Sequence, residues 1–250
     1  MLYAEEAGTG AGRFSGKGIY KRFGSLSVLE NVDFSMGMTE AVGIVGPNGA
    51  GKTTLLATLA GAFPPSAGSV EFGGRNVTRQ SAAERCRLGL VRTHQVPKPF
   101  LGMTTFENVY VAASHSDVNS RDEAYERVIQ SLDVCGMLPV ANRKAETLGL
   151  LDRKRLELAR ALATQPKVIL LDEIGGGLTD SEAQELVHTI QGLKSRGVGI
   201  VWIEHIVHVL LQVVDRLICM DAGRIIADGE PKMVMAHPEV VKAYLGGGPA

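Results

Sequence analysis

The chain has 250 residues, 45% of them apolar, which is enough to build the core of one large α/β domain or of two small ones. Its 26 Lys and Arg residues nearly balance its 27 Asp and Glu residues, and the net charge of -1 argues against a general nucleic-acid-binding surface. No apolar run approaches the roughly 18 to 20 residues of a membrane span. Glu5 and Glu6 stand where a signal peptide would be basic, so we expect a protein that stays in the cytoplasm.

The first half of the sequence predicts strands around a glycine-rich loop. Residues 1–17 are rich in glycine and poor in large apolar side chains, so we expect a flexible leader. Strand-like patterns follow at 19–23 and 28–36, and a short apolar run at 41–45 ends at Gly46. Helical spacing begins near Thr53 and stops at Gly61. The predicted order is an antiparallel element, a strand, a glycine loop and a helix.

Helical patterns dominate from about 97 to 160. Ser120 to Glu123 has the pattern of a capping box, and a second helix ends before Pro166. Apolar runs at 168–171 and 198–203 are typical of buried parallel strands, and helices are expected from Thr179 and over 206–214. A hairpin is expected between 216 and 227. This alternation predicts an α/β fold with a doubly wound sheet.

The three cysteines are odd in number and far apart. Cys86, Cys135 and Cys219 form no CxxC pair and have no neighbouring histidine. We interpret them as reduced packing residues.

The segment 46–53 reads Gly-Pro-Asn-Gly-Ala-Gly-Lys-Thr and matches G-x-x-x-x-G-K-[ST] between a predicted strand and a predicted helix. Glycines let successive backbone N–H groups surround phosphate oxygens, Lys52 reaches the β and γ phosphates, and Thr53 can ligate Mg²⁺. The alternative is a glycine-rich turn with an exposed lysine. The sequence therefore predicts ATP and Mg²⁺ as ligands. The expected nucleotide-binding residues are Gly46, Pro47, Asn48, Gly49, Ala50, Gly51, Lys52, Thr53 and Thr54.

Two adjacent carboxylates, Asp172 and Glu173, follow the apolar run 168–171. That position is the carboxyl end of a buried strand, where sheet ligands bind. Asp172 can hold Mg²⁺ through water, and Glu173 can orient or deprotonate the water that attacks the γ-phosphate. The alternative is that both acids simply precede a helix N-terminus.

These two elements, in this order and spacing, resemble the nucleotide-binding subunit of an ABC transporter over about residues 18–246. The resemblance implies an α/β P-loop NTPase fold of ABC type, with a mostly parallel sheet core at 18–96 and 161–246 and an antiparallel β edge. An inserted α-helical subdomain at about 97–160 and a tail at 247–250 complete the implied organisation. It also implies that Phe23, 29 residues before Lys52, stacks on adenine. The implied catalytic residues are Glu173, His205, which contacts the γ-phosphate, Gln95, which senses Mg²⁺ and water, and Lys52. The implied metal-binding residues are Thr53, Gln95 and, through water, Asp172.

The chain departs from the family where one subunit completes the ATP site of its partner. The signature Leu-Ser-Gly-Gly-Gln aligns with Leu148, Gly149, Leu150, Leu151 and Asp152, so the serine and both glycines are missing. Branched Leu151 hinders close backbone approach, and Asp152 either brings a negative charge near phosphate or caps the next helix. Ile174 and Thr179 also differ from the usual proline and Asp or Asn. We therefore expect a heterodimer with a related ATPase subunit, a homodimer being the alternative.

Residues 103–108 and 238–246 resemble the branched-chain amino-acid type of importer ATPase. This likeness implies a subunit that hydrolyses ATP to power import of branched-chain amino acids or related small polar solutes. The implied partners are transmembrane permease subunits, contacted through Pro97, Phe100 and Leu101, and an extracytoplasmic solute-binding protein, with no nucleic acid. The subunit would then lie peripherally on the cytoplasmic face of the membrane. A soluble ABC ATPase not tied to transport, and a regulatory nucleotide-binding subunit with little hydrolysis, remain alternatives.

Overall fold

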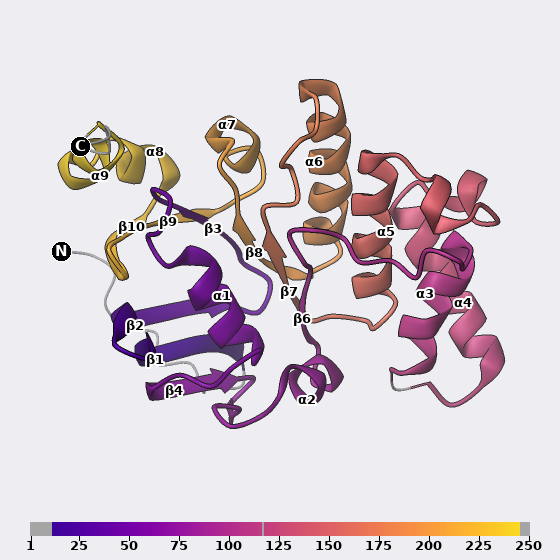
Figure 1. Cartoon of the computed structure of the whole chain (residues 1–250), viewed down its shortest axis with the longest axis horizontal. Helices are drawn as coiled ribbons and strands as arrows, with labels where there is room; N and C mark the ends of the chain where they lie inside the picture. The colour runs from indigo at the N-terminus through magenta and orange to yellow at the C-terminus, as the bar shows by residue number, and fades with distance from the viewer. Residues whose placement is uncertain (1–11, 117, 246–250) are drawn as a thin grey trace.

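Two β-sheets and a group of helices make up residues 12–116 and 118–245, which a computed structural model describes (Figure 1). The smaller sheet is antiparallel and has the strand order β2-β1-β4-β5. Its strands are β1 (Arg13–Phe23), β2 (Leu26–Gly37), β4 (Ala67–Phe72) and β5 (Arg75–Asn76). The predicted antiparallel element ahead of the glycine loop is therefore present.

The predicted flexible leader is wrong for residues 13–17, which form the start of β1. Phe14 is fully buried, and its ring lies edge-on to Phe34 and Phe72 with both centroids 5.6 Å away. Backbone pairing with β2 and β4 on either side satisfies the polar groups of this glycine-rich segment. The leader was predicted from glycine content alone, and the pairing with β2 and β4 was not visible in the local sequence. Residues 1–11 lie outside the described part of the chain.

The larger sheet has the order β10-β9-β3-β8-β7-β6. Its strands are β3 (Ala41–Val45), β6 (Leu90–Arg92), β7 (Val168–Asp172), β8 (Gly199–Ile203), β9 (Arg216–Asp221) and β10 (Arg224–Gly229). All its pairs are parallel except the β9–β10 hairpin, which turns at Ala222 and Gly223 with φ of 45° and 78°. Because β3, β6, β7 and β8 run in parallel, their carboxyl ends meet at one edge of the sheet.

Helices cover both faces of this sheet. α1 (Lys52–Ala60) lies between the two sheets, and its leucines share a buried cluster with residues of β3, β7 and β8 (Figure 1). The opposite face is covered by α6 (Asp180–Ser195), whose N-cap Thr179 forms a full capping box with Glu182. α7 (Val207–Leu210) is much shorter than the helix predicted over 206–214. The remaining short helices are α2 (Ala82–Arg87), α8 (Pro231–Met235) and α9 (Pro238–Leu245).

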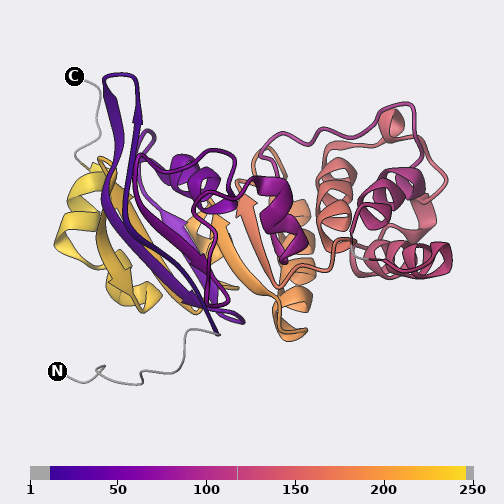
Figure 2. The same cartoon turned by 90° about the horizontal axis from the view of Figure 1, so that it is seen from below.

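A group of three helices extends to one end of the molecule (Figure 2). It comprises α3 (Thr105–Ser114), α4 (Arg121–Val134) and α5 (Leu150–Leu162), with short 3₁₀ turns between α4 and α5. Ser120 caps α4, but Glu123 bonds the backbone of Asn119, so the predicted capping box is only half formed. Their buried side chains continue the apolar cluster of the sheet face. Within residues 12–116 and 118–245, no helix is long and apolar enough to cross a bilayer.

Candidate functional site

The glycine loop lies between β3 and α1, as predicted. Gly51 has φ of 97°, and a Cβ built there would stand 2.9 Å from Leu29 Cδ2 and 3.0 Å from Val28 O. The carbonyl of Ala50 accepts a hydrogen bond from Gly223 N at 3.1 Å, so the β9–β10 turn supports the loop. Only glycine satisfies both the backbone angle and the close approach of β2 at this position.

Lys52 is the first residue of α1, and its side chain is turned back over the loop. Nζ donates to the carbonyl oxygens of Gly46, at 2.7 Å, and Pro47, at 2.9 Å. Burial lowers the pKa of Lys52, and the nearby Glu173 carboxylate opposes that shift. The N-terminus of α1 has no side-chain cap, so its N–H groups and the lysine together form a site suited to anions.

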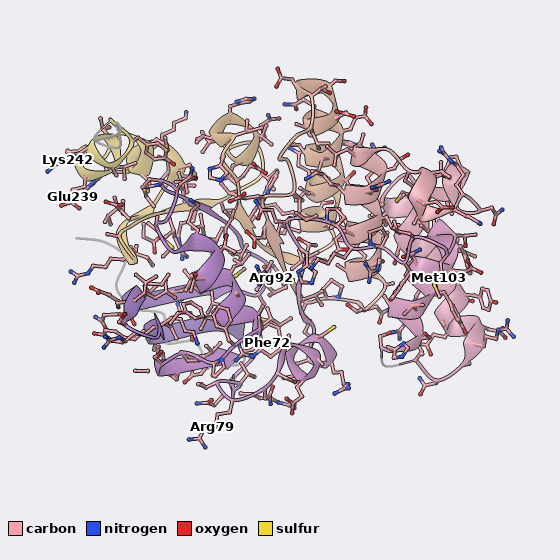
Figure 3. The ribbon with its side chains drawn as sticks, in the orientation of Figure 1. Phe72, Arg79, Arg92, Met103, Glu239 and Lys242 are labelled. Atoms are coloured by element: carbon pink, nitrogen blue, oxygen red, sulfur yellow. The ribbon has the colours of Figure 1, made fainter. Side chains whose placement is uncertain are left out.

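Asp172 ends β7 and is fully buried. Thr53 Oγ1 donates to Asp172 Oδ1 at 3.3 Å, which brings together the two predicted oxygen ligands for Mg²⁺. The other carboxylate oxygen, Oδ2, accepts from Arg92 Nη2 at 2.6 Å. This buried charge is therefore neutralised by an arginine that ends β6, close to the centre of the view in Figure 3.

Glu173 is the point where three of the predicted catalytic residues meet. Its Oε2 accepts from Gln95 Nε2, and its Oε1 lies 2.8 Å from His205 Nε2. A carboxylate only accepts, so the second contact places a hydrogen on Nε2 of the histidine. The backbone of Glu173 has φ of 50°, a left-handed conformation that costs about 1 to 3 kcal/mol in a non-glycine residue. The fold holds that strain and fixes the carboxylate between Gln95 and His205.

Phe23 is not part of this cluster. It ends β1 and is 47% exposed, and its ring lies edge-on to Phe63 with the centroids 5.3 Å apart. Lys21 Nζ lies 5.0 Å from the same centroid. Phe23 thus stands at the surface next to the segment that follows α1, where one ring face of an aromatic can take a ligand.

The five residues aligned with the family signature lie at the start of α5. Leu148 is buried, Gly149 is the N-cap, and Leu150 begins the helix with 46% of its surface exposed. Asp152 lies within the first turn, 3.9 Å from Arg155, so the suggestion that it caps the helix is wrong. A glycine N-cap offers no side-chain oxygen, which leaves the first N–H groups of α5 without a side-chain partner.

Four residues that sequence reasoning missed also contribute to this region. Arg92 pairs with Asp172, and the signal available was a basic residue ending the strand next to the acidic one. Glu204 is 2% exposed, and its carboxylate accepts from the backbone N–H groups of Gly175 and His205. It therefore fixes the backbone of His205 and of the segment that follows Glu173. Lys154 of α5 is 5% exposed. Burial lowers its pKa, and the Glu204 and Glu173 carboxylates only partly oppose that shift. The fourth, Tyr244, accepts from Gly46 N through its hydroxyl oxygen.

Comparison with protein families gives two matches. A family model described as "ABC transporter" covers residues 29–175, and one described as "Branched-chain amino acid ATP-binding cassette transporter" covers residues 224–250. The chain is 34% identical over 245 residues to the high-affinity branched-chain amino acid transport ATP-binding protein LivG of Escherichia coli (strain K12), covering 92% of this chain and 96% of that protein. The corresponding protein BraF of Pseudomonas aeruginosa is 33% identical over 244 residues, with the same coverage.

A solved structure supports the same comparison. The ADP conformation of MJ1267, an ATP-binding cassette of an ABC transporter, superimposes with a TM-score of 0.85 at 30% identity. The match covers 94% of this chain and 99% of that one. The fold predicted from the sequence is therefore confirmed.

Proposed function

Because this chain belongs to the ATP-binding subunits of ABC transporters, we propose that Glu173 is the general base of ATP hydrolysis at the loop 46–53. Proteins of this family are ATPases, and the chain is one of them. One observation carries the assignment: the Glu173 carboxylate is held between Gln95 and His205, beside buried Lys52. ATP hydrolysis at this site would power a transporter.

The phosphate groups of ATP would displace two contacts of Lys52. Its Nζ bonds loop carbonyls of Gly46 and Pro47, and a phosphate oxygen is a stronger partner because it carries charge. The uncapped N-terminus of α1 would supply backbone N–H groups to the same phosphates. Exposed Phe23 would stack on the adenine.

Mg²⁺ is the metal that the oxygen donors of this site favour. Thr53 and Asp172 present a hydroxyl and a carboxylate 3.3 Å apart, and Gln95, whose Nε2 donates to Glu173, carries an amide oxygen as a third candidate ligand. Thr53 and Gln95 would hold the ion directly and Asp172 through water. The bound ion supplies positive charge to the phosphate oxygens.

Glu173 would accept a proton from the attacking water while the oxygen of that water bonds to the γ-phosphorus. The bond to the β-phosphate oxygen breaks, and ADP leaves with that electron pair. His205 and Gln95 would orient the Glu173 carboxylate, and with ATP bound His205 would turn its Nε2–H from Glu173 to a γ-phosphate oxygen.

We infer that the transported solute is a branched-chain amino acid or a related small polar solute. Support comes from the relatives LivG and BraF, which are branched-chain amino acid transport ATP-binding proteins, and from the carboxyl-terminal family match. Permease subunits would dock on the loop after Gln95, where Phe100 and Leu101 are 45% and 51% exposed. A solute-binding protein would complete the assembly, and this subunit would lie peripherally on the cytoplasmic face of the membrane.

The proposed dimer partner is a related subunit with an intact signature. Leu150 and Leu151 replace the glycines that let a backbone approach the γ-phosphate across a dimer, and exposed Leu150 adds bulk there. The site on this chain would then be completed by the partner, while the reciprocal site turns over slowly.

Phosphate release with Mg-ATP tests the proposal, measured over a series of protein concentrations. Glu173→Gln is expected to abolish turnover and keep ATP binding, whereas Glu126→Gln on exposed α4 is the matched control and should leave turnover unchanged. Activity that rises with concentration of the chain alone would indicate a homodimer, and activity only with the partner a heterodimer. Binding without release in both cases would favour the regulatory alternative and contradict the role of Glu173.

A further inference from the structure

A cavity of about 780 Å³ opens at the amino-terminal ends of the parallel strands. The residues just before β6, β7 and β8, namely Gly89, Lys167 and Val198, all line it. Asp172 and Glu173 lie at the other end of β7, about 17 Å away for a five-residue strand. α2, which precedes β6, lies toward the lower side of the molecule in Figure 1. The cavity is thus separate from the ATP site.

Positive charge is concentrated on the lining. Four lining residues, Arg75, Arg87, Lys167 and Arg196, are exposed and make no salt bridge or side-chain hydrogen bond within residues 12–116 and 118–245. A fifth, Arg127, bonds Ser116 and Glu123. No acidic side chain of the described residues lines the cavity. In a chain of net charge -1, this local excess of cations focuses a positive potential on one concave site.

Apolar side chains form part of the remaining wall. Phe72, whose side chain Figure 3 labels, lies on β4, and Leu88 and Pro166 stand near the entries to β6 and β7. A single inorganic ion would leave most of 780 Å³ unfilled, whereas pockets of roughly 300 to 1,000 Å³ with apolar walls and a few polar groups suit cofactor-sized ligands. Gln165 adds an amide to this wall from a left-handed backbone conformation, φ 54°, which few non-glycine residues adopt.

We propose that this cavity binds a small nucleotide-type polyanion. Two or more phosphate groups would face Arg75, Arg87, Lys167 and Arg196, and the ring portion would rest on the apolar wall. The lining joins the β4–β5 turn, α2 and α4, so a bound ligand would hold these elements together and stabilise the fold. The proposal goes beyond ATP hydrolysis and does not depend on it.

Calorimetry with the full chain carrying Lys52→Ala tests the proposal, because this variant weakens binding at the loop 46–53. The probes are adenosine diphosphate and inorganic pyrophosphate without Mg²⁺. Adenosine diphosphate is expected to bind, and Arg87→Glu or Arg196→Glu to raise its Kd by at least about tenfold, the size of a lost charge-assisted hydrogen bond. Arg79→Glu makes the same charge change on a side chain that points away from the molecule in Figure 3, and Kd should stay within about twofold.

A second measurement keeps the test independent of the loop. Cys86 is half-buried and lines the cavity, so adenosine diphosphate should slow alkylation of its thiol, and should not do so in Arg87→Glu. Thermal melting confirms that each variant is folded. Absence of binding, equal loss in Arg79→Glu, or pyrophosphate binding as tightly as the nucleotide would overturn the proposal. Binding to phosphatidylglycerol vesicles without binding of adenosine diphosphate would also overturn it, in favour of a lipid headgroup.

Discussion

Tyr244 Oη accepts a hydrogen bond from the backbone N–H of Gly46 at 3.0 Å, across 198 residues of sequence. Gly46 opens the phosphate loop, and its carbonyl also accepts from Lys52. Tyr244 belongs to α9, within the carboxyl-terminal family match, and burial raises the pKa of its phenol, which stays neutral near pH 7. The end of the chain thus fixes the first residue of the loop that holds phosphate.

Tyr244→Phe removes this hydrogen bond and keeps the ring. A neutral hydrogen bond is worth about 1 kcal/mol, so we expect ATP affinity to fall about fivefold. Tyr20→Phe, at an exposed position on β1, is the control. Equal Kd values for ATP in Tyr244→Phe and the parent chain would show that α9 does not position the loop.

Arg92→Gln leaves the buried Asp172 carboxylate without its cation. Removing one partner of a buried ion pair costs about 3 to 5 kcal/mol, so the free energy of unfolding in urea should fall by that order. Arg224→Gln breaks the exposed pair with Glu30 and should change it little. Similar midpoints for the two variants would mean that Asp172 is already compensated by another group.

Gly51→Ala introduces a methyl group against Leu29 and the Val28 carbonyl, at a residue with φ of 97°. We expect loss of ATP binding and a lower melting temperature. The Val28 carbonyl belongs to the backbone and cannot move aside as the end of a flexible side chain can. Gly24→Ala also has positive φ, 59°, but meets nothing within 4 Å, so it separates strain from crowding. Equal effects of the two substitutions would show that strain alone decides.

Gly149→Ser, Leu150→Gly and Leu151→Gly, combined in one variant, test the asymmetric dimer. In a dimer with the partner subunit, the triple requirement of hydroxyl, small residue and free N–H groups is then met again, and turnover at the partner's site should rise at least about tenfold. Each glycine in the first turn of α5 costs about 1 kcal/mol of helix stability, so urea unfolding is measured in parallel. Unchanged turnover in a folded variant would indicate that the natural segment already works.

Two buried thiols predict a loss of stability at high pH. Burial raises the pKa of Cys135 to about 12 and that of Cys219 to about 11, against about 8.5 in an unfolded chain. Above pH 8.5 the unfolded thiols ionise while the folded ones stay neutral, so the free energy of unfolding should fall by about 1.4 kcal/mol per pH unit for each thiol. This fall continues up to about pH 11 for Cys219. Cys219→Ala should have a shallower slope, and an identical slope would contradict the assignment.

The sequence by itself determined the local chemistry. The residue sequence of 46–53 specifies a loop with positive φ values and an anion site. The glycines that set this backbone shape lie within a few residues of Lys52. The acidic pair that ends the apolar run 168–171 was placed correctly for the same reason: apolar run and strand end are adjacent in sequence. The strand of residues 13–17 was missed because its stability comes from partners on both sides.

Only the tertiary structure decided which distant groups meet. Arg92 and Asp172 are 80 residues apart, and Tyr244 and Gly46 are 198 apart, so no local pattern links them. Parallel strands carry Arg92 and Asp172 to one edge of the sheet, and the opposite edge gathers the cations of the cavity. Such contacts depend on strand order and packing, which are properties of the whole fold and not of neighbouring residues.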